Sequence, residues 1–284
     1  MNNLLFYLGN RRSLLIDIRG RESAEWLFMS YERETEAMLS AARQAGEIAL
    51  WHFRAGTAAE VKEDQSPVTA ADRECEQFIS GSLSAGFPAD GILGEEGTHK
   101  PSHSGRRWLI DPIDGTRDFV RRNRFWSVQI ALEADGRIVL GAIYFPLLAE
   151  MLHAISGVGC YWNDAPTRVA DTSRLDKAIL AVSGFKSAWG VWDAEALRRL
   201  TEICWTVRGY GASYDIAMLA RGKADIWLSG NGMEWDYAPA RTIAQESGAR
   251  FLTRDGTGRI DARHCLICTP GLEQELRALL RMRG

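Results

Sequence analysis

The chain has no long hydrophobic run. Among its 284 residues, no apolar stretch reaches the roughly 18 residues expected of a membrane-spanning helix, so we expect no membrane partner. It also has no strong excess of either charge, because 34 Lys and Arg stand against 37 Asp and Glu and leave a net charge of −3. A chain with this balance offers no broad basic surface, which argues against a nucleic-acid partner.

Cysteine is scarce and scattered. An odd, dispersed set excludes a disulfide framework and predicts a reducing compartment, the cytoplasm. Two cysteines have the CxxC spacing of a metal or redox pair, but they lie in an apolar, strand-like run without a second pair. We therefore predict that these two are buried core residues. The five cysteines are Cys75, Cys160, Cys204, Cys265 and Cys268, of which the last two form the CxxC.

What the chain does have is the composition of an ordinary globular protein, with 46% hydrophobic and 25% charged residues. Its length suits one large or two medium domains. We expect an N-terminal extension over residues 1–30, an α+β half over 31–175 and an α/β half over 176–284. The first 28 residues lack a clean secretory signal, and our hypothesis is that activity needs only the chain from Met29 onward.

The hydrophobic pattern predicts helices and strands in a layered arrangement. In the first half, helical spacing marks 33–55 and 70–85, and apolar runs mark strands at 92–96, 107–110, 127–133, 137–145 and 150–156. In the second half, strands at 178–183, 206–210, 224–228, 250–253 and 265–269 alternate with helices at 193–204, 212–221, 236–247 and 271–282. The predicted fold class is a layered α+β and α/β sandwich.

The segment WLIDPIDGT, Trp108–Thr116, carries the clearest chemical signal. A short apolar strand delivers Asp111 and Asp114 to a sheet edge, and Gly115 lets the chain turn closely around a ligand. Two carboxylates held together would repel each other, so the pair calls for a hard metal ion. If a helix starts at Thr116, the amides of Gly115 and Thr116 point at an anion that the metal holds.

Two further acidic elements fit the same site. Glu95 and Glu96 end a strand just upstream, although solvated loop acids are a common alternative. Asp236 suits the N-cap of a helix, with Pro239 in its first turn, and capping alone would explain it. As a set, however, these acids supply oxygen ligands from three separate segments.

The three motifs resemble those of the inositol monophosphatase superfamily of metal-dependent phosphatases. GEE at 94–96, DPIDGT at 111–116 and WD at 235–236 occur in the family's order, and Lys62 with SPVTAAD at 66–72 resembles its mobile metal loop. The resemblance covers about residues 33–280. It implies a phosphoric monoester hydrolase of the sugar-phosphatase fold, a homodimer, and two or three Mg²⁺ per subunit.

The resemblance also assigns roles to residues. Glu95, Asp111 and the Ile113 carbonyl would hold one Mg²⁺, while Asp111, Asp114 and Asp236 would hold a second, and Glu95 would hold a looser third through waters. Thr116 with Asp72 would orient the attacking water and take its proton, and Glu96 would orient a metal-bound water. Thr116 has the alternative role of a helix cap. The predicted substrate contacts are Gly115, Thr116, Asp118, Arg208, Ser213 and Asp236.

The substrate itself stays open. Inositol-type members have a sugar-binding glutamate seven residues before the WD aspartate, where this chain has Ser229. Inositol monophosphate and histidinol phosphate are therefore both retained as the small-molecule phosphate ester, with 3′(2′),5′-bisphosphate nucleotides and fructose-1,6-bisphosphate as further alternatives. Asp118 either meets a substrate ammonium or pairs with Arg121 or Arg122. A catalytically silent member that only binds phosphate is the alternative from a different class.

Overall fold

The structure is a computed structural model that describes residues 5–8, 12–15, 31–56, 58–62, 67–211 and 213–282. Most of the predicted extension over 1–30, and residues 63–66 of the predicted metal loop, lie outside the described residues. Within the extension, the strands β1 (Leu5–Leu8) and β2 (Arg12–Leu15) pair in antiparallel fashion. No helix of the described part of the chain is long and apolar enough to cross a membrane.

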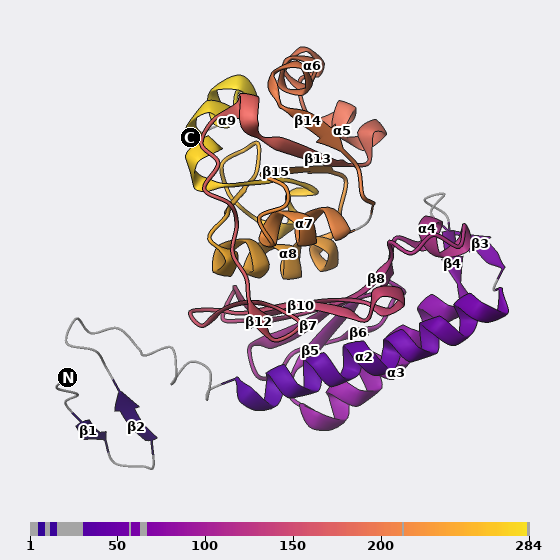
Figure 1. The fold of residues 1–284 in the computed structure, drawn as a ribbon. Coiled ribbons are helices and arrows are strands. Elements are labelled where there is room, and N and C mark those ends of the chain that lie inside the picture. Colours follow the sequence, from indigo (N-terminus) through magenta and orange to yellow (C-terminus); the bar gives the residue numbers. More distant parts are fainter. Residues whose placement is uncertain are drawn as a thin grey trace.

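Two sheets and three helical layers alternate, which confirms the predicted layered sandwich (Figure 1). An eight-stranded sheet runs in the order β12-β11-β10-β9-β8-β7-β5-β6, and a five-stranded sheet in the order β14-β13-β15-β17-β16. Helices α2 and α3 cover the outer face of the first sheet, while α7 and α8 lie between the sheets. Helices α5, α6 and α9 cover the outer face of the second sheet.

The strands of the first sheet are β5 (Gly91–Gly94), β6 (His99–Lys100), β7 (Arg106–Asp114), β8 (Ser127–Ala134), β9 (Arg137–Phe145), β10 (Glu150–Ile155), β11 (Gly159–Trp162) and β12 (Ala165–Pro166). Those of the second are β13 (Ile179–Ser183), β14 (Thr206–Arg208), β15 (Ile226–Gly230), β16 (Arg250–Leu252) and β17 (His264–Cys268). The helices are α2 (Glu32–Ala55), α3 (Ala70–Gly86), α4 (Thr116–Val120), α5 (Phe185–Val191), α6 (Ala194–Ile203), α7 (Tyr214–Ala220), α8 (Glu234–Ser247) and α9 (Glu273–Leu279). A small ribbon of β3 (Ala59–Val61) and β4 (Pro67–Thr69) precedes α3. The described residues also form four short 3₁₀ turns: Pro146–Leu148, Leu175–Lys177, Ile260–Ala262 and Pro270–Leu272.

Strand β7 shows how the sequence distributes its residues between layers. Successive side chains of a strand point to opposite faces. Trp108 and Ile110 accordingly lie in the core beneath α2 and α3, whereas Leu109 lies in the core around α7 and α8. Asp111 continues the face of Leu109, so the strand carries its first aspartate into the layer between the two sheets.

Strand β7 is also longer than the predicted 107–110, and it contains a bulge. Asp111 pairs with Gln129 and Asp114 with Ser127, so three steps along β7 match two along β8. The extra residue lies at Pro112–Ile113, where a proline without an N–H is tolerated in an otherwise central strand. In a regular strand, two residues three apart would face opposite sides. The bulge places Asp111 and Asp114 on the same face of the sheet.

The start of helix α8 differs from the prediction. Met233, not Asp236, is the N-cap, and Asp236 is the third helical residue, whose Oδ2 accepts the backbone N–H of Met233 at 2.6 Å. Pro239 therefore lies inside the helix rather than in its first turn. The sequence pattern also did not predict α5 or the short strands β3, β4, β6, β11 and β12.

Two other expectations concern the core and the division of the chain. All five cysteines are buried and free, which confirms the prediction for Cys265 and Cys268. The first sheet ends at Pro166 and the second begins at Ile179. The proposed domain boundary between 175 and 176 lies in that connection and stays a prediction.

Candidate active site

Three aspartates from two distant segments meet in the middle layer. One carboxylate oxygen from each of Asp111, Asp114 and Asp236 lies within 4.8 Å of the others. The bulge of β7 supplies the first two, and the first turn of α8, packed against β7, supplies the third. Asp111 is buried, while Asp114 and Asp236 are partly exposed, so the cluster lies at the border between protein and solvent.

Burial and mutual repulsion perturb all three groups. Burial, followed by the charges of Glu95, Asp114 and Asp236, raises the pKa of Asp111 well above its usual range. Burial also raises the pKa of Asp114 to about 6 and, together with the charge of Asp114, that of Asp236 to about 7. The neighbouring carboxylates of Asp111, Asp114 and Asp236 repel one another when charged. A bound cation would offset that repulsion.

The surroundings of one carboxylate oxygen indicate whether a metal ion fits the cluster. Oδ1 of Asp111 is buried and has no hydrogen-bond partner, an arrangement that proteins avoid unless an ion or water completes it. Three convergent carboxylates are the oxygen ligands that Mg²⁺ prefers. The residues present therefore fit a divalent cation.

Glu95 and Glu96 lie beside this cluster because β5 runs parallel to β7. Gly94 pairs with Ile110, and the N–H of Glu95 donates to the Ile110 carbonyl at 3.1 Å. Both carboxylates bind the ammonium of Lys62, at 3.1 Å for Glu95 and 2.6 Å for Glu96.

The ion pairs of Lys62 affect the pKa of each partner. Burial alone would lower the pKa of Lys62, but its bonds to Glu96 and Glu95 outweigh that effect and raise it. Burial raises the pKa of Glu96 to about 7. Lys62 thus holds two acids whose charges would otherwise add to the repulsion in the cluster.

Glu76 fixes the Glu95–Glu96 turn, and no sequence motif predicts this role. Its carboxylate accepts the N–H groups of Glu96 at 2.7 Å and Thr98 at 2.8 Å. A side chain at Gly94 would collide with this carboxylate and displace it from the turn. A lone acid within a predicted helix is too ordinary to be singled out without the fold.

The side chains of Asp72 and Thr116, for which a shared role in proton transfer is predicted, lie next to each other. Oδ2 of Asp72 accepts the backbone N–H and the hydroxyl of Thr69, at 2.8 and 2.6 Å, in a capping box at the start of α3. Its other oxygen lies 3.4 Å from Oγ1 of Thr116, which is 3.2 Å from the carbonyl oxygen of Ile113. Burial raises the pKa of Asp72.

Thr116 does not cap a helix in the structure, so the alternative role predicted for it is wrong. Gly115 is the N-cap of α4, at a φ of 88° that favours glycine, and Thr116 is the first helical residue. The hydroxyl of Thr116 is therefore directed to Asp72 and the Ile113 carbonyl rather than to a helix end.

Of the predicted substrate contacts, Ser213 bonds to the aspartate cluster, whereas Asp118 and Arg208 bond to residues outside it. Ser213 reaches the cluster through its backbone, because its N–H donates to Oδ2 of Asp114 at 2.7 Å while its hydroxyl bonds that of Ser127 at 2.6 Å. Asp118 is partly exposed and accepts a bond from Asn123 at 2.7 Å instead of pairing with Arg121 or Arg122. The guanidinium of Arg208 bonds the hydroxyl of Thr206 and the carbonyl of Val207 on its own strand.

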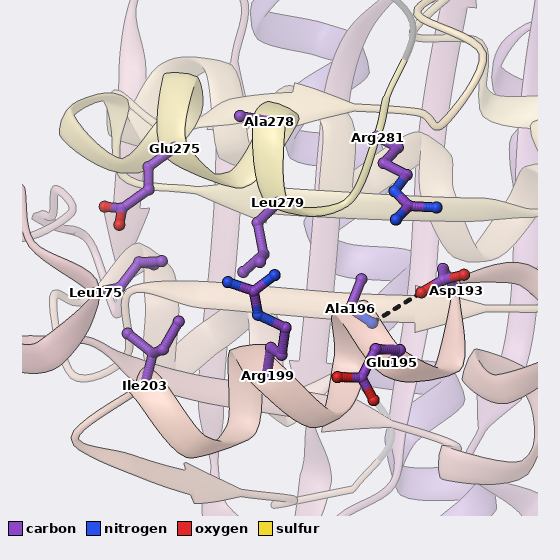
Figure 2. A pocket seen from close by; sticks show the side chains of 10 residues that line it. All are labelled: Leu175, Asp193, Glu195, Ala196, Arg199, Ile203, Glu275, Ala278, Leu279 and Arg281. Carbon is purple, nitrogen blue, oxygen red and sulfur yellow. Dashed lines mark hydrogen bonds between the residues drawn. The ribbon is translucent and has the colours of Figure 1, made fainter.

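A separate cavity of about 360 Å³ lies on the outer side of the five-stranded sheet. Figure 2 shows Arg199 and Leu279 extending into it between α6 and α9. None of the predicted site residues lines it, so we do not assign it to the reaction.

Comparison with known proteins agrees with this geometry. Histidinol-phosphatase of Chlorobaculum parvum is 33% identical over 241 residues, which are 82% of this chain and 93% of that protein. Inositol-1-monophosphatase of Bacillus subtilis is 33% identical over 196 residues, 66% of this chain and 73% of that protein. The crystal structure of the extragenic suppressor protein suhB from Bartonella henselae has a TM-score of 0.80 at 27% identity, with 87% of this chain and 98% of that chain covered.

The relatives named as phosphatases, together with the shared fold, define an enzyme that hydrolyses small-molecule phosphate monoesters. Residues 30–282 match the inositol monophosphatase family, and the chain belongs to it. Members of this family depend on Mg²⁺. The family and the reaction class predicted from the sequence are thereby confirmed.

Proposed function

We propose that this protein is a Mg²⁺-dependent phosphatase whose principal metal ligands are Glu95, Asp111, Asp114 and Asp236. The observation that carries the proposal is the unpartnered, buried Oδ1 of Asp111 within reach of two other carboxylates. One Mg²⁺ would bind Glu95, Asp111 and the Ile113 carbonyl, and a second would bind the three aspartates. A third, looser ion beside Glu95 would require Lys62 to move away.

The chain's own residues would then direct the hydrolysis. When bound, Mg²⁺ supplies positive charge for the phosphate and lowers the pKa of a water molecule. Thr116 orients the attacking water through its hydroxyl, and Asp72, with Oδ1 directed at that hydroxyl, accepts the proton. Glu96 orients a second water. The amides of Gly115 and Thr116 would donate hydrogen bonds to the phosphate oxygens, and the hydrolysis would need no covalent intermediate with the protein.

For the substrate, we favour histidinol phosphate over inositol monophosphate. Ser229 stands where inositol-type members have a sugar-binding glutamate, and its hydroxyl is bonded to that of Tyr237 at 3.1 Å, so this position offers a polyol no carboxylate. Asp118 is partly exposed next to Gly211 and would suit an ammonium group. The similarity to histidinol-phosphatase over nearly the full length of that protein supports the same choice.

The test is a panel of phosphate esters with released phosphate as the readout. It contains histidinol phosphate, inositol-1-phosphate, fructose-1,6-bisphosphate and 3′-phosphoadenosine 5′-phosphate, each with and without Mg²⁺. We expect Mg²⁺-dependent release that is fastest with histidinol phosphate, and at least a hundredfold loss in Asp111→Asn, which is about 2.7 kcal/mol of barrier. Preference for inositol-1-phosphate would overturn the substrate, and no release from any ester would favour the silent, phosphate-binding alternative.

Two broader features belong to the same proposal. We place the enzyme in the cytoplasm because five buried cysteines stay free. The resemblance also implies a homodimer, which light scattering of the purified chain would test. A monomer at micromolar concentration would contradict it.

A further inference from the structure

Arg107 lies on the face of β7 that carries Asp111, four residues before it. It is paired across the sheet with Glu133 of β8, and its Nε and Nη2 donate to Oε2 of Glu133 at 3.1 and 2.8 Å. The same Nη2 donates to Oε2 of Glu234 at 2.6 Å. One guanidinium thus joins two strands of the first sheet to the helical layer above them.

Glu234 is the first residue of α8, two positions before Asp236. Asp236 is held within its own helix by the N–H of Met233, so it moves with this first turn. Two links therefore connect β7 with the start of α8, which Figure 1 shows between the two sheets. One is the Arg107–Glu234 ion pair, and the other is the convergence of Asp111 and Asp114 with Asp236.

Without a cation the second link is repulsive, because it brings like charges together. The first link does not depend on a cation. All three side chains of the first link are partly shielded from water, with 35% of Arg107, 19% of Glu133 and 29% of Glu234 exposed. A doubly paired guanidinium in that setting holds a more fixed geometry than an exposed surface pair.

We propose that Arg107 is a positioning residue that holds Asp236 in place for Mg²⁺ by bridging Glu133 and Glu234. The inference rests on the metal ligands given under the proposed function. It predicts that loss of the bridge lowers the affinity for Mg²⁺, while the reaction at saturating Mg²⁺ keeps most of its rate, since the guanidinium of Arg107 binds Glu133 and Glu234 and not the residues proposed to contact the substrate.

The sign of the effect separates positioning from simple electrostatics. Arg107→Met removes a positive charge from the neighbourhood of a cation site, so a pure charge effect would tighten Mg²⁺ binding. Loss of positioning would weaken it instead. The two explanations therefore predict opposite changes for the same variant.

Arg106 provides a matched control. It is the neighbouring residue on the opposite face of β7, and its guanidinium binds Asp90 and Glu34 at 2.7 Å each. Arg106→Met breaks an equally extensive ion-pair network beneath α2 without touching α8. A general loss of stability would appear in both variants, whereas a change in Mg²⁺ affinity is expected only at Arg107.

The experiment is calorimetric titration of the metal-free, full-length chain with Mg²⁺, alongside the Mg²⁺ dependence of phosphate release. We expect Arg107→Met to bind Mg²⁺ about tenfold more weakly, Arg107→Lys to recover part of that loss, and Arg106→Met to match the parent within twofold. Glu234→Ala is the second variant. It leaves the Arg107–Glu133 pair intact, so it tests the link to α8 even if Arg107→Met fails to fold.

Unchanged or tighter Mg²⁺ binding in Arg107→Met, equal weakening in Arg106→Met, or a parent chain that binds no Mg²⁺ would each overturn the inference. If Arg107→Met fails to fold, unchanged binding in Glu234→Ala would overturn it as well. An inactive parent that still binds Mg²⁺ with the expected order of affinities would overturn the proposed function alone.

Discussion

At the scale of single residues, the most informative detail is that the two carboxylate oxygens of Asp72 have different partners. One of its oxygens is fully engaged by Thr69, and the other is directed to Thr116. A carboxylate held this way cannot rotate freely, so its second oxygen keeps a fixed direction for receiving a proton. Fixed geometry of this kind is what general-base catalysis requires.

We expect Thr116→Val to reduce kcat by about tenfold to a thousandfold, in the range typical of a lost proton-transfer or orienting group. The shape of the side chain is nearly kept, so Mg²⁺ affinity should change little. Steady-state kinetics over a range of Mg²⁺ concentrations would separate the two effects. Thr116→Ser keeps the hydroxyl and serves as the control. An inactive Thr116→Ser would show that packing, not the hydroxyl, is what matters.

Short motifs predict some of the acidic residues, whereas others can be found only from the fold. Asp111, Asp114 and Asp236 stand in short, distinctive segments, and the structure brings them together. Asp215 could not be found this way. It accepts the hydroxyl of Ser183 at 2.5 Å and the N–H of Tyr210 at 2.8 Å, joining the ends of β13 and β14. Its partners are common residues, brought close only by tertiary folding.

At the scale of elements, periodicity predicted the long helices well and the ends of the strands poorly. Helix α2 runs over Glu32–Ala55 against a predicted 33–55, because a broad apolar face and Gly56 mark it clearly. Strand β7 extends four residues beyond its predicted end, because a bulge has no hydrophobic signature. The ends of such strands are set by hydrogen bonds to neighbouring strands, which the local sequence pattern does not show.

The position of α8 depends on a close approach to β9. A side chain at Gly141 would lie 2.8 Å from Cα of Pro239 and 2.9 Å from its carbonyl oxygen, and neither backbone atom can move away cheaply. We expect Gly141→Ala to lower the free energy of unfolding by about 1–3 kcal/mol and to weaken Mg²⁺ binding by shifting Asp236. Urea denaturation and Mg²⁺ titration would measure both.

Gly81 in α3 is the matched control, because a side chain there would meet nothing within 4 Å. Gly81→Ala should leave Mg²⁺ binding unchanged and raise stability by up to about 1 kcal/mol, since alanine is the better helix former. Equal effects of the two substitutions would show that the close contact at Pro239 is unimportant.

At the scale of the whole molecule, the raised pKa values make the metal-free protein sensitive to pH. Asp114 titrates near 6 and both Asp236 and Glu96 near 7 in the folded state, against about 4 in an unfolded chain. The folded state therefore binds more protons than the unfolded state between about pH 4 and 7. The stability that these groups contribute is present below pH 4 and is lost as the pH rises through 6 to 7.

We expect the Tm of the metal-free protein to be several degrees lower at pH 8 than at pH 5.5, at about 2–4 °C per kcal/mol. Mg²⁺ should raise Tm more at pH 8 than at pH 5.5, because protons compete with it for the same oxygens. Differential scanning calorimetry at both pH values would measure this. Asp111→Asn should show a weaker pH dependence, and an unchanged dependence would mean that the cluster is not its source.

The distance between Asp114 and Asp236 along the chain has a consequence for how the protein is made. Any nascent chain that ends before α8 carries two of the three clustered aspartates and lacks the third. During synthesis the cluster cannot close until α8 has been translated and has folded onto β7. Metal binding by all three aspartates therefore requires that synthesis and folding have passed α8.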